Sequence, residues 1–277
     1  MSRIDAHQHF WQFDPIRDSW ITEEMQPLRR NFGPADLQPL LQTSGIDGSV
    51  LVQADQSEEE NHFMLAHAQA HDFIKGVVGW VDFRHPEVEE RLAFYRQFPK
   101  MKGFRHVLQG EPDRAMMLSP SFRRGIARLE PFGYTYDILI YPDQLGYTRE
   151  FVASFPNQPF VIDHIAKPHI KDRYITDEWR NAIHAVAAHE NVWCKISGMV
   201  TEADWQHWKP EHLRVYIDTV VEAFGTERIL FGSDWPVCLL AATYNRVLAV
   251  VQDYFSSFAA EEQTAFFGGN AIKFYSL

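Results

Sequence analysis

Two histidines near the amino terminus and one aspartate near the carboxyl terminus are the residues best suited to chemistry. His7 and His9 stand two residues apart in the apolar-flanked run 4–11. Side chains two residues apart on a β-strand point to the same face, so both imidazoles should face one side. Such a pair can hold a metal ion or polarise a carbonyl oxygen, although histidines packed at the end of a sheet would look the same. A second apolar run ends on a carboxylate, Asp234, which favours a shared site.

Short β-rich runs alternate with amphipathic helical segments along the chain. We expect strands at residues 3–9, 49–54, 75–82, 101–106, 134–140, 160–164, 192–197 and 228–234, with helices at 58–70, 87–98, 122–129, 145–155, 177–189, 213–224 and closing helices within 243–277. This alternation predicts parallel strands, and eight such units favour an α/β fold, a single (β/α)8 barrel of the TIM type spanning residues 1–277. A doubly wound open sheet is the alternative, but no Gly-x-Gly-x-x-Gly follows the first strand.

The carboxyl ends of the strands carry polar side chains. In a (β/α)8 barrel these ends form the active site, so such residues should meet at one rim. They are His7, His9, Gln53, Asp55, Asp82, Arg105, His106, Asp137, Tyr141, His164, Lys195, Ser197 and Asp234. Two long irregular segments, 14–33 and 109–120, are typical of lids or binding loops.

Composition narrows the class of partner. The chain has 277 residues and a net charge of −11, which argues against nucleic acid or an anionic membrane. Only two cysteines are present, and neither a signal peptide nor an apolar run of about 20 residues stands out. We therefore expect a cytoplasmic protein that acts on a small molecule. Its oligomeric state is left open.

Five motifs together resemble the amidohydrolase superfamily, in the branch of sugar lactonases for L-fucono- and L-rhamnono-lactones and the related pyrone-dicarboxylate lactonases. The motifs lie at residues 5–11, 102–105, 162–168, 195–198 and 232–236. The resemblance implies a hydrolase that opens an aldonolactone to its sugar acid. It also implies that Asp234 activates water, while His7, His9 and His164 polarise the ester carbonyl. A base for water and donors for the developing oxyanion are what lactone opening needs.

The resemblance also bears on metal binding. Two bridged metal ions would need a bridging lysine after strand four or five, but those strands end at Arg105 and Tyr141. Lactonases of this branch are thought to work without metal, so we expect no strictly required cofactor. A single divalent ion, such as zinc, remains possible because nitrogen and oxygen donors suit it. Its ligands would be His7, His9, His164 and Asp234.

Further residues near strand exits are predicted to bind the substrate. They are Arg105, Trp11, Tyr141, Lys167 and Trp235. Arg105 could instead pair only with a structural carboxylate, and the aromatic residues could pack at the rim. Two other functions remain open: a metal-dependent decarboxylase of the same barrel group, and a barrel that binds a sugar acid without turning it over.

Overall fold

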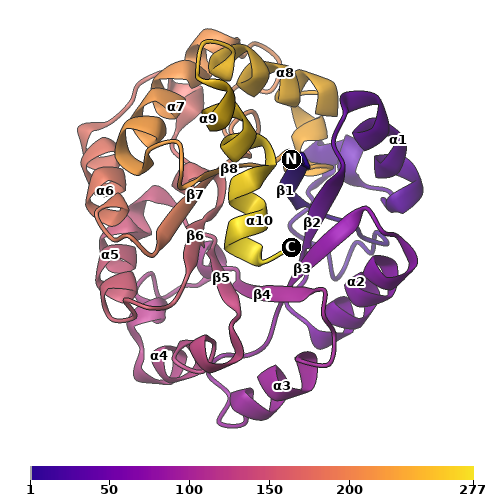
Figure 1. The fold of residues 1–277 in the computed structure, drawn as a ribbon, viewed down its shortest axis with the longest axis vertical. Coiled ribbons are helices and arrows are strands. Elements are labelled where there is room, and N and C mark those ends of the chain that lie inside the picture. The colour runs from indigo at the N-terminus through magenta and orange to yellow at the C-terminus, as the bar shows by residue number, and fades with distance from the viewer. Residues whose placement is uncertain (1) are drawn as a thin grey trace.

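Eight parallel strands form one sheet that curls into a barrel in the computed structural model, which describes residues 2–277 (Figure 1). The strands pair in chain order, each with the next. They are β1 (Ile4–Gln8), β2 (Gly48–Val52), β3 (Ile74–Gly79), β4 (Met101–His106), β5 (Thr135–Ile138), β6 (Phe160–Ile162), β7 (Val192–Ile196) and β8 (Ile229–Phe231). The predicted (β/α)8 barrel is confirmed, and the order excludes the doubly wound alternative.

Helices surround the barrel on its outside (Figure 1). Four of them follow a capping residue, Ser57, Ser119, Thr176 or Thr243, whose hydroxyl accepts a hydrogen bond from a backbone N–H in the first turn. No helix in residues 2–277 is long and apolar enough to cross a membrane. The helices are α1 (Pro34–Ser44), α2 (Glu58–Ala70), α3 (Val88–Tyr95), α4 (Pro120–Ile126), α5 (Leu145–Ala153), α6 (Asp177–Ala187), α7 (Pro210–Phe224), α8 (Tyr244–Phe255), α9 (Ala260–Thr264) and α10 (Asn270–Tyr275).

The barrel closes where the end of β1 meets the segment that follows β8. Asp234 donates its backbone N–H to the His7 carbonyl at 2.9 Å, and His9 donates to the Trp235 carbonyl at 2.7 Å. The last residue of β1, Gln8, forms a parallel bridge with Trp235. Closure of the barrel therefore brings residues from the two ends of the chain side by side.

The carboxyl-terminal helix α10 covers the amino-terminal end of the barrel, where Figure 1 shows it inside the ring of strands. Phe274 and Tyr275 pack in one apolar cluster with residues of six strands, among them Ile4 of β1. Just before α10, a Cβ atom at Gly268 would lie 2.0 Å from the carbonyl oxygen of Ser2. The chain can approach this closely only because Gly268 has no side chain.

Candidate active site

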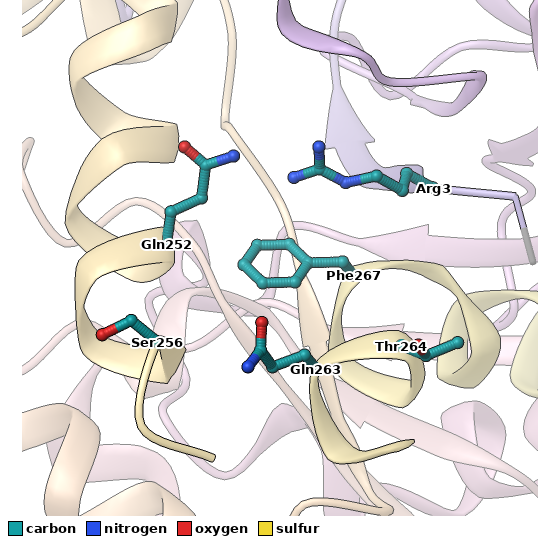
Figure 2. Close-up of a pocket in the computed structure, with 6 residues that line it drawn as sticks. All are labelled: Arg3, Gln252, Ser256, Gln263, Thr264 and Phe267. Atoms are coloured by element: carbon teal, nitrogen blue, oxygen red, sulfur yellow. The ribbon is translucent and has the colours of Figure 1, made fainter. Parts of the chain in front are cut away.

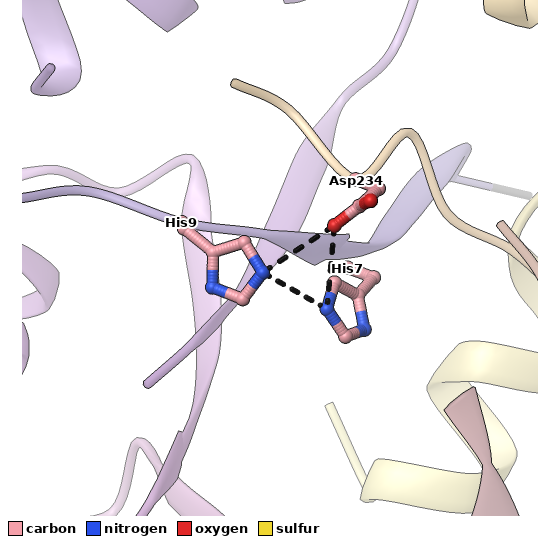
Figure 3. A group of neighbouring side chains, drawn as sticks. All are labelled: His7, His9 and Asp234. Carbon is pink, nitrogen blue, oxygen red and sulfur yellow. Dashed lines mark hydrogen bonds and ion pairs between the residues drawn. The ribbon is translucent and has the colours of Figure 1, made fainter. Parts of the chain in front are cut away.

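Four side chains predicted from the sequence converge at the carboxyl ends of β1, β6 and β8. The Nε2 atoms of His7 and His9 are 3.1 Å apart. Oδ1 of Asp234 lies 3.5 Å from Nε2 of His9 and 3.9 Å from Nε2 of His7, as Figure 3 shows. Nε2 of His164 lies 3.8 Å from the same carboxylate oxygen. All four residues are buried, so the group forms one site deep in the barrel mouth.

A left-handed backbone aims two of these side chains. His164 has a φ of 54° and Asp234 a φ of 57°. The left-handed turn at His164 continues through residues 165–167, at a cost of about 1–2 kcal/mol for each non-glycine residue. β6 ends at Ile162 and β8 at Phe231, earlier than the sequence predicted, because the chain leaves each strand before the left-handed residue that points its side chain inward. A backbone held in this conformation at a cluster of polar groups is typical of a functional site.

Burial and neighbouring charges set the protonation of the site. Burial lowers the pKa of all three imidazoles, and that of His164 falls to about 4. Burial alone would raise the pKa of Asp234, but the neighbouring His164 and His9 outweigh burial, and the pKa lies below its ordinary value. At neutral pH the site therefore holds an ionised carboxylate among neutral imidazoles.

A buried ionic network lies directly beneath the site. The ammonium of Lys195, on β7, pairs with Asp137 of β5 and lies 2.9 Å from Oδ1 of Asp163. The same ammonium is 3.0 Å from Nδ1 of His7, and Arg105 holds the other oxygen of Asp163 at 3.0 Å. Lys195 and His7 outweigh burial and keep the pKa of Asp163 well below its ordinary value. Asp163 was not predicted as a site residue, although its charge directly after an apolar strand could have indicated a role at the strand end.

A cavity of about 300 Å3 opens above this group. Two of the residues predicted to bind substrate, Arg105 and Lys167, lie on its wall, as do His9, His164 and Asp234. The rest of the wall divides into polar and apolar parts. The polar residues include Asp55, Gln56 and Gln109, and the apolar ones include Val107, Leu139 and Val237.

None of the three aromatic residues predicted to bind substrate, Trp11, Tyr141 and Trp235, lies on the cavity wall. Trp11 and Trp235 are only 2% and 1% exposed, because both rings pack edge-on against Phe32 in the core. Tyr141 is 40% exposed and does not belong to the cavity wall. These placements differ from the expectation of stacking on the sugar. The aromatic side chain on the cavity wall is Trp20, which the long segment 14–33 supplies and the sequence analysis did not propose.

The donor atoms of the site fit a single divalent ion. Nδ1 of His9 lies 2.7 Å from the Val52 carbonyl, which can only accept, so Nδ1 carries the proton and the Nε2 lone pair faces Asp234. The ligand atoms of His7, His9 and Asp234 all lie within 4.8 Å of one another. Two or three imidazole nitrogens with one carboxylate oxygen are donors that zinc accepts. The guanidinium of Arg105, 3.4 Å from Nε2 of His7, opposes a cation there.

A second and larger hollow, of about 520 Å3, lies beside the start of β1 (Figure 2). Arg3 and Phe267 lie on it, with the guanidinium 5.0 Å from the centre of the ring. Two glutamines and two hydroxyl residues complete its lining. This lining contains neither a carboxylate nor an imidazole that could act as a base. This hollow is larger than the cavity above Asp234 but lacks a group for general-base chemistry, so volume does not identify the catalytic pocket.

Comparison with known proteins identifies the family. The Amidohydrolase family model matches residues 4–277, so the chain belongs to this family. An L-fucono-1,5-lactonase of Burkholderia multivorans is 40% identical over 285 residues, which cover 99% of this chain and 96% of that protein. A second L-fucono-1,5-lactonase, from Burkholderia ambifaria, is 37% identical over 99% of this chain and 96% of its own length.

A solved structure shows the same fold. An amidohydrolase from Burkholderia multivorans, described with bound zinc, superimposes with a TM-score of 0.96 at 39% identity, over the full length of both chains. The resemblance seen in the five sequence motifs is thereby confirmed.

Proposed function

We propose that this protein is a sugar lactonase, a carboxylic-ester hydrolase that opens an aldonolactone such as L-fucono-1,5-lactone to the sugar acid. The observation that carries the proposal is a buried Asp234 whose Oδ1 lies 3.5, 3.8 and 3.9 Å from Nε2 of His9, His164 and His7. The two relatives named L-fucono-1,5-lactonase support it, because each aligns with 99% of this chain. The cavity is also of the size expected for a small ligand.

In the proposed mechanism, Asp234 takes a proton from water as the water oxygen attacks the lactone carbonyl carbon. Imidazole N–H groups of His7 and His164 donate to the oxygen on which negative charge develops, whereas His9, whose proton is donated to the Val52 carbonyl, positions His7. The guanidinium of Arg105 on the cavity wall adds positive charge nearby. When the ring C–O bond breaks, the proton held by Asp234 passes to the leaving ring oxygen. The product is the open-chain acid.

The cavity wall supplies the means to orient a sugar ring. We propose that Asp55, Gln56 and Gln109 bind ring hydroxyls, while Trp20 covers an apolar face of the ring. Lys167 is placed to bind the carboxylate of the product. The predicted stacking on Trp11 and Trp235 has no part in this proposal, because both rings are buried.

A single divalent ion could be held by His7, His9, His164 and Asp234. It would polarise the carbonyl and lower the pKa of a bound water. We propose that lactone opening does not strictly require it, because Asp234 is already ionised and the imidazoles can donate hydrogen bonds. We also propose that the protein acts on a small-molecule lactone and that it does so in the cytoplasm.

A substrate panel tests this function. Protein treated with a chelator and analysed for metal is offered L-fucono-1,5-lactone, L-rhamnono-lactone and a dihydroxybenzoate, with a pH indicator and a measurement of released CO2. We expect acid release from a sugar lactone well above the spontaneous rate, and no CO2. CO2 release that needs added zinc would instead establish the decarboxylase. Ligand-induced thermal stabilisation without any product would establish a sugar-acid-binding barrel.

A further inference from the structure

Three acceptor atoms surround the Lys195 ammonium. Lys195 is fully buried, and its Nζ lies near Oδ2 of Asp137, 2.9 Å from Oδ1 of Asp163 and 3.0 Å from Nδ1 of His7. An ammonium has three donors and cannot accept. Nζ donates to Oδ2 of Asp137 and to Nδ1 of His7, and it forms an ion pair with Oδ1 of Asp163. Nδ1 of His7 must then present its lone pair and cannot carry a hydrogen.

The hydrogen bond between His9 and Val52 independently supports a proton on Nε2 of His7. His9 donates its Nδ1 proton to the Val52 carbonyl, which leaves a lone pair on Nε2. Nε2 of His7 is 3.1 Å from this lone pair. Because Nδ1 of His7 accepts from Lys195, the ring carries its single proton on Nε2. Placed on Nε2, this proton completes a continuous series of hydrogen bonds from Lys195 through His7 and His9 to Val52.

We infer that Lys195 is a positioning residue that fixes the tautomer of His7, with the ring proton on Nε2, where it is donated to Nε2 of His9. In this tautomer the Nε2 proton, which is donated to His9 in the free protein, can be shared with a lactone carbonyl oxygen. His7 cannot ligate a metal through Nε2, because ligation needs the lone pair there. Lys195 thereby favours the metal-free form of the site. The catalytic half of this inference rests on the proposed lactonase function, whereas the tautomer and the metal affinity do not.

The opposite tautomer has weaker support in the geometry. With its proton on Nδ1, His7 would donate to Oδ1 of Asp163 at 3.3 Å and accept from Arg105 at 3.4 Å. Both distances are longer than the 3.0 and 3.1 Å of the first arrangement. It would also set two N–H donors, on Lys195 and His7, against each other, and leave two imidazole lone pairs facing each other. A metal ion bound between those two lone pairs would relieve their repulsion. Metal binding therefore favours the His7 proton on Nδ1, whereas Lys195 favours it on Nε2.

Nitrogen NMR on the unsubstituted, metal-free protein tests the tautomer directly. Histidines labelled with 15N give distinct two-bond correlations for each tautomer, and His7 is assigned among the 13 histidines by the signal that disappears in His7→Gln. We expect the protonated nitrogen of His7 to be Nε2. Protonation at Nδ1 would overturn the inference. This measurement needs no change at Lys195.

Replacement of the lysine tests the consequence. In Lys195→Met we expect zinc to bind about tenfold to 100-fold more tightly, as measured by competition with a chelator, because His7 can then turn its lone pair to the cavity. The kcat for lactone opening should fall about tenfold or more, while KM changes less. Lys102→Met is the matched control, since Lys102 bonds the Ser276 carbonyl at 2.8 Å outside the site and should change neither quantity.

The outcomes separate the two proposals. Equal zinc affinity in Lys195→Met and the unsubstituted protein would overturn the role of Lys195, whatever the lactonase activity. A protein that opens no lactone would refute the proposed function and leave the NMR and zinc results as tests of Lys195. If loss of the buried ammonium prevents folding, Lys195→Met with Asp137→Asn removes one of the carboxylates left unpaired, and the same zinc comparison applies.

Discussion

Replacing Gly198 by alanine should damage the site through a single added methyl group. Gly198 follows β7 with a φ of +64°, and a Cβ there would lie 2.6 Å from Nδ1 of His164 and 3.0 Å from its Cβ. His164 cannot simply move back, because it is held by its own left-handed backbone and by Ser197, whose hydroxyl lies 2.9 Å from Nδ1. The methyl group should therefore push the imidazole away from Asp234.

The expected magnitude has two parts. The left-handed backbone costs an alanine about 1–2 kcal/mol, and overpacking in a rigid site costs about 1–3 kcal/mol. The free energy of unfolding should therefore fall by about 2–5 kcal/mol. Because displacement of a catalytic group by about 1 Å can cost 100-fold in rate, kcat/KM should fall by about 100-fold.

Urea unfolding and the lactone assay measure the two effects of Gly198→Ala separately. Gly133→Ala is the control, because Gly133 has a φ of +72° but no heavy atom of the described residues within 4 Å of the added Cβ. It should lose about 1–2 kcal/mol of unfolding free energy and keep its kcat/KM. Full activity in Gly198→Ala would refute the role given to His164 and its placement by Gly198.

Two further predictions concern the cavity wall and the dependence of stability on pH. Trp20→Ala should raise KM about three- to tenfold with little change in kcat or stability, because Trp20 is 41% exposed and lines the cavity, whereas Tyr147→Ala, also exposed, should leave KM unchanged. Burial raises the pKa of Glu60 to about 7 from an ordinary 4.5, so folding favours its protonated form. Its contribution is greatest below that ordinary pKa and is lost as pH rises towards 7, by about 3 kcal/mol in all. In Glu60→Gln, urea unfolding at about pH 5 and about pH 8 should show a smaller difference, and an unchanged difference would contradict this.

The barrel could be predicted from the sequence because its strands are short, apolar and evenly interrupted. Helix α2 begins and ends where predicted, at Glu58 and Ala70, since its acidic first turn and Ser57 cap mark the start. Helix α1 was missed. Its residues 34–44 include two prolines, which resemble a loop pattern, although Pro34 occupies the first helical position, where proline is favoured.

The members of the catalytic cluster could also be predicted, because a barrel places all strand ends at one rim. What could not be predicted was which polar residues lie beneath the rim. Asp137 and Lys195 stand at strand ends in the sequence, yet they pair inside the barrel with Asp163. Nor does the sequence show that Trp11 and Trp235 face the core. Their orientation depends on Phe32, which arrives from a long irregular segment whose path has no periodic pattern.

The most direct test of this account is the kcat/KM of Asp234→Asn for L-fucono-1,5-lactone, measured beside the unsubstituted protein and beside Asp253→Asn, which changes an exposed aspartate on α8. Loss of a general base typically costs 100-fold to about 10,000-fold, so we expect a fall of that size in Asp234→Asn and none in Asp253→Asn. Activity in Asp234→Asn equal to that of the unsubstituted protein would contradict the assignment of Asp234 as the base that activates water.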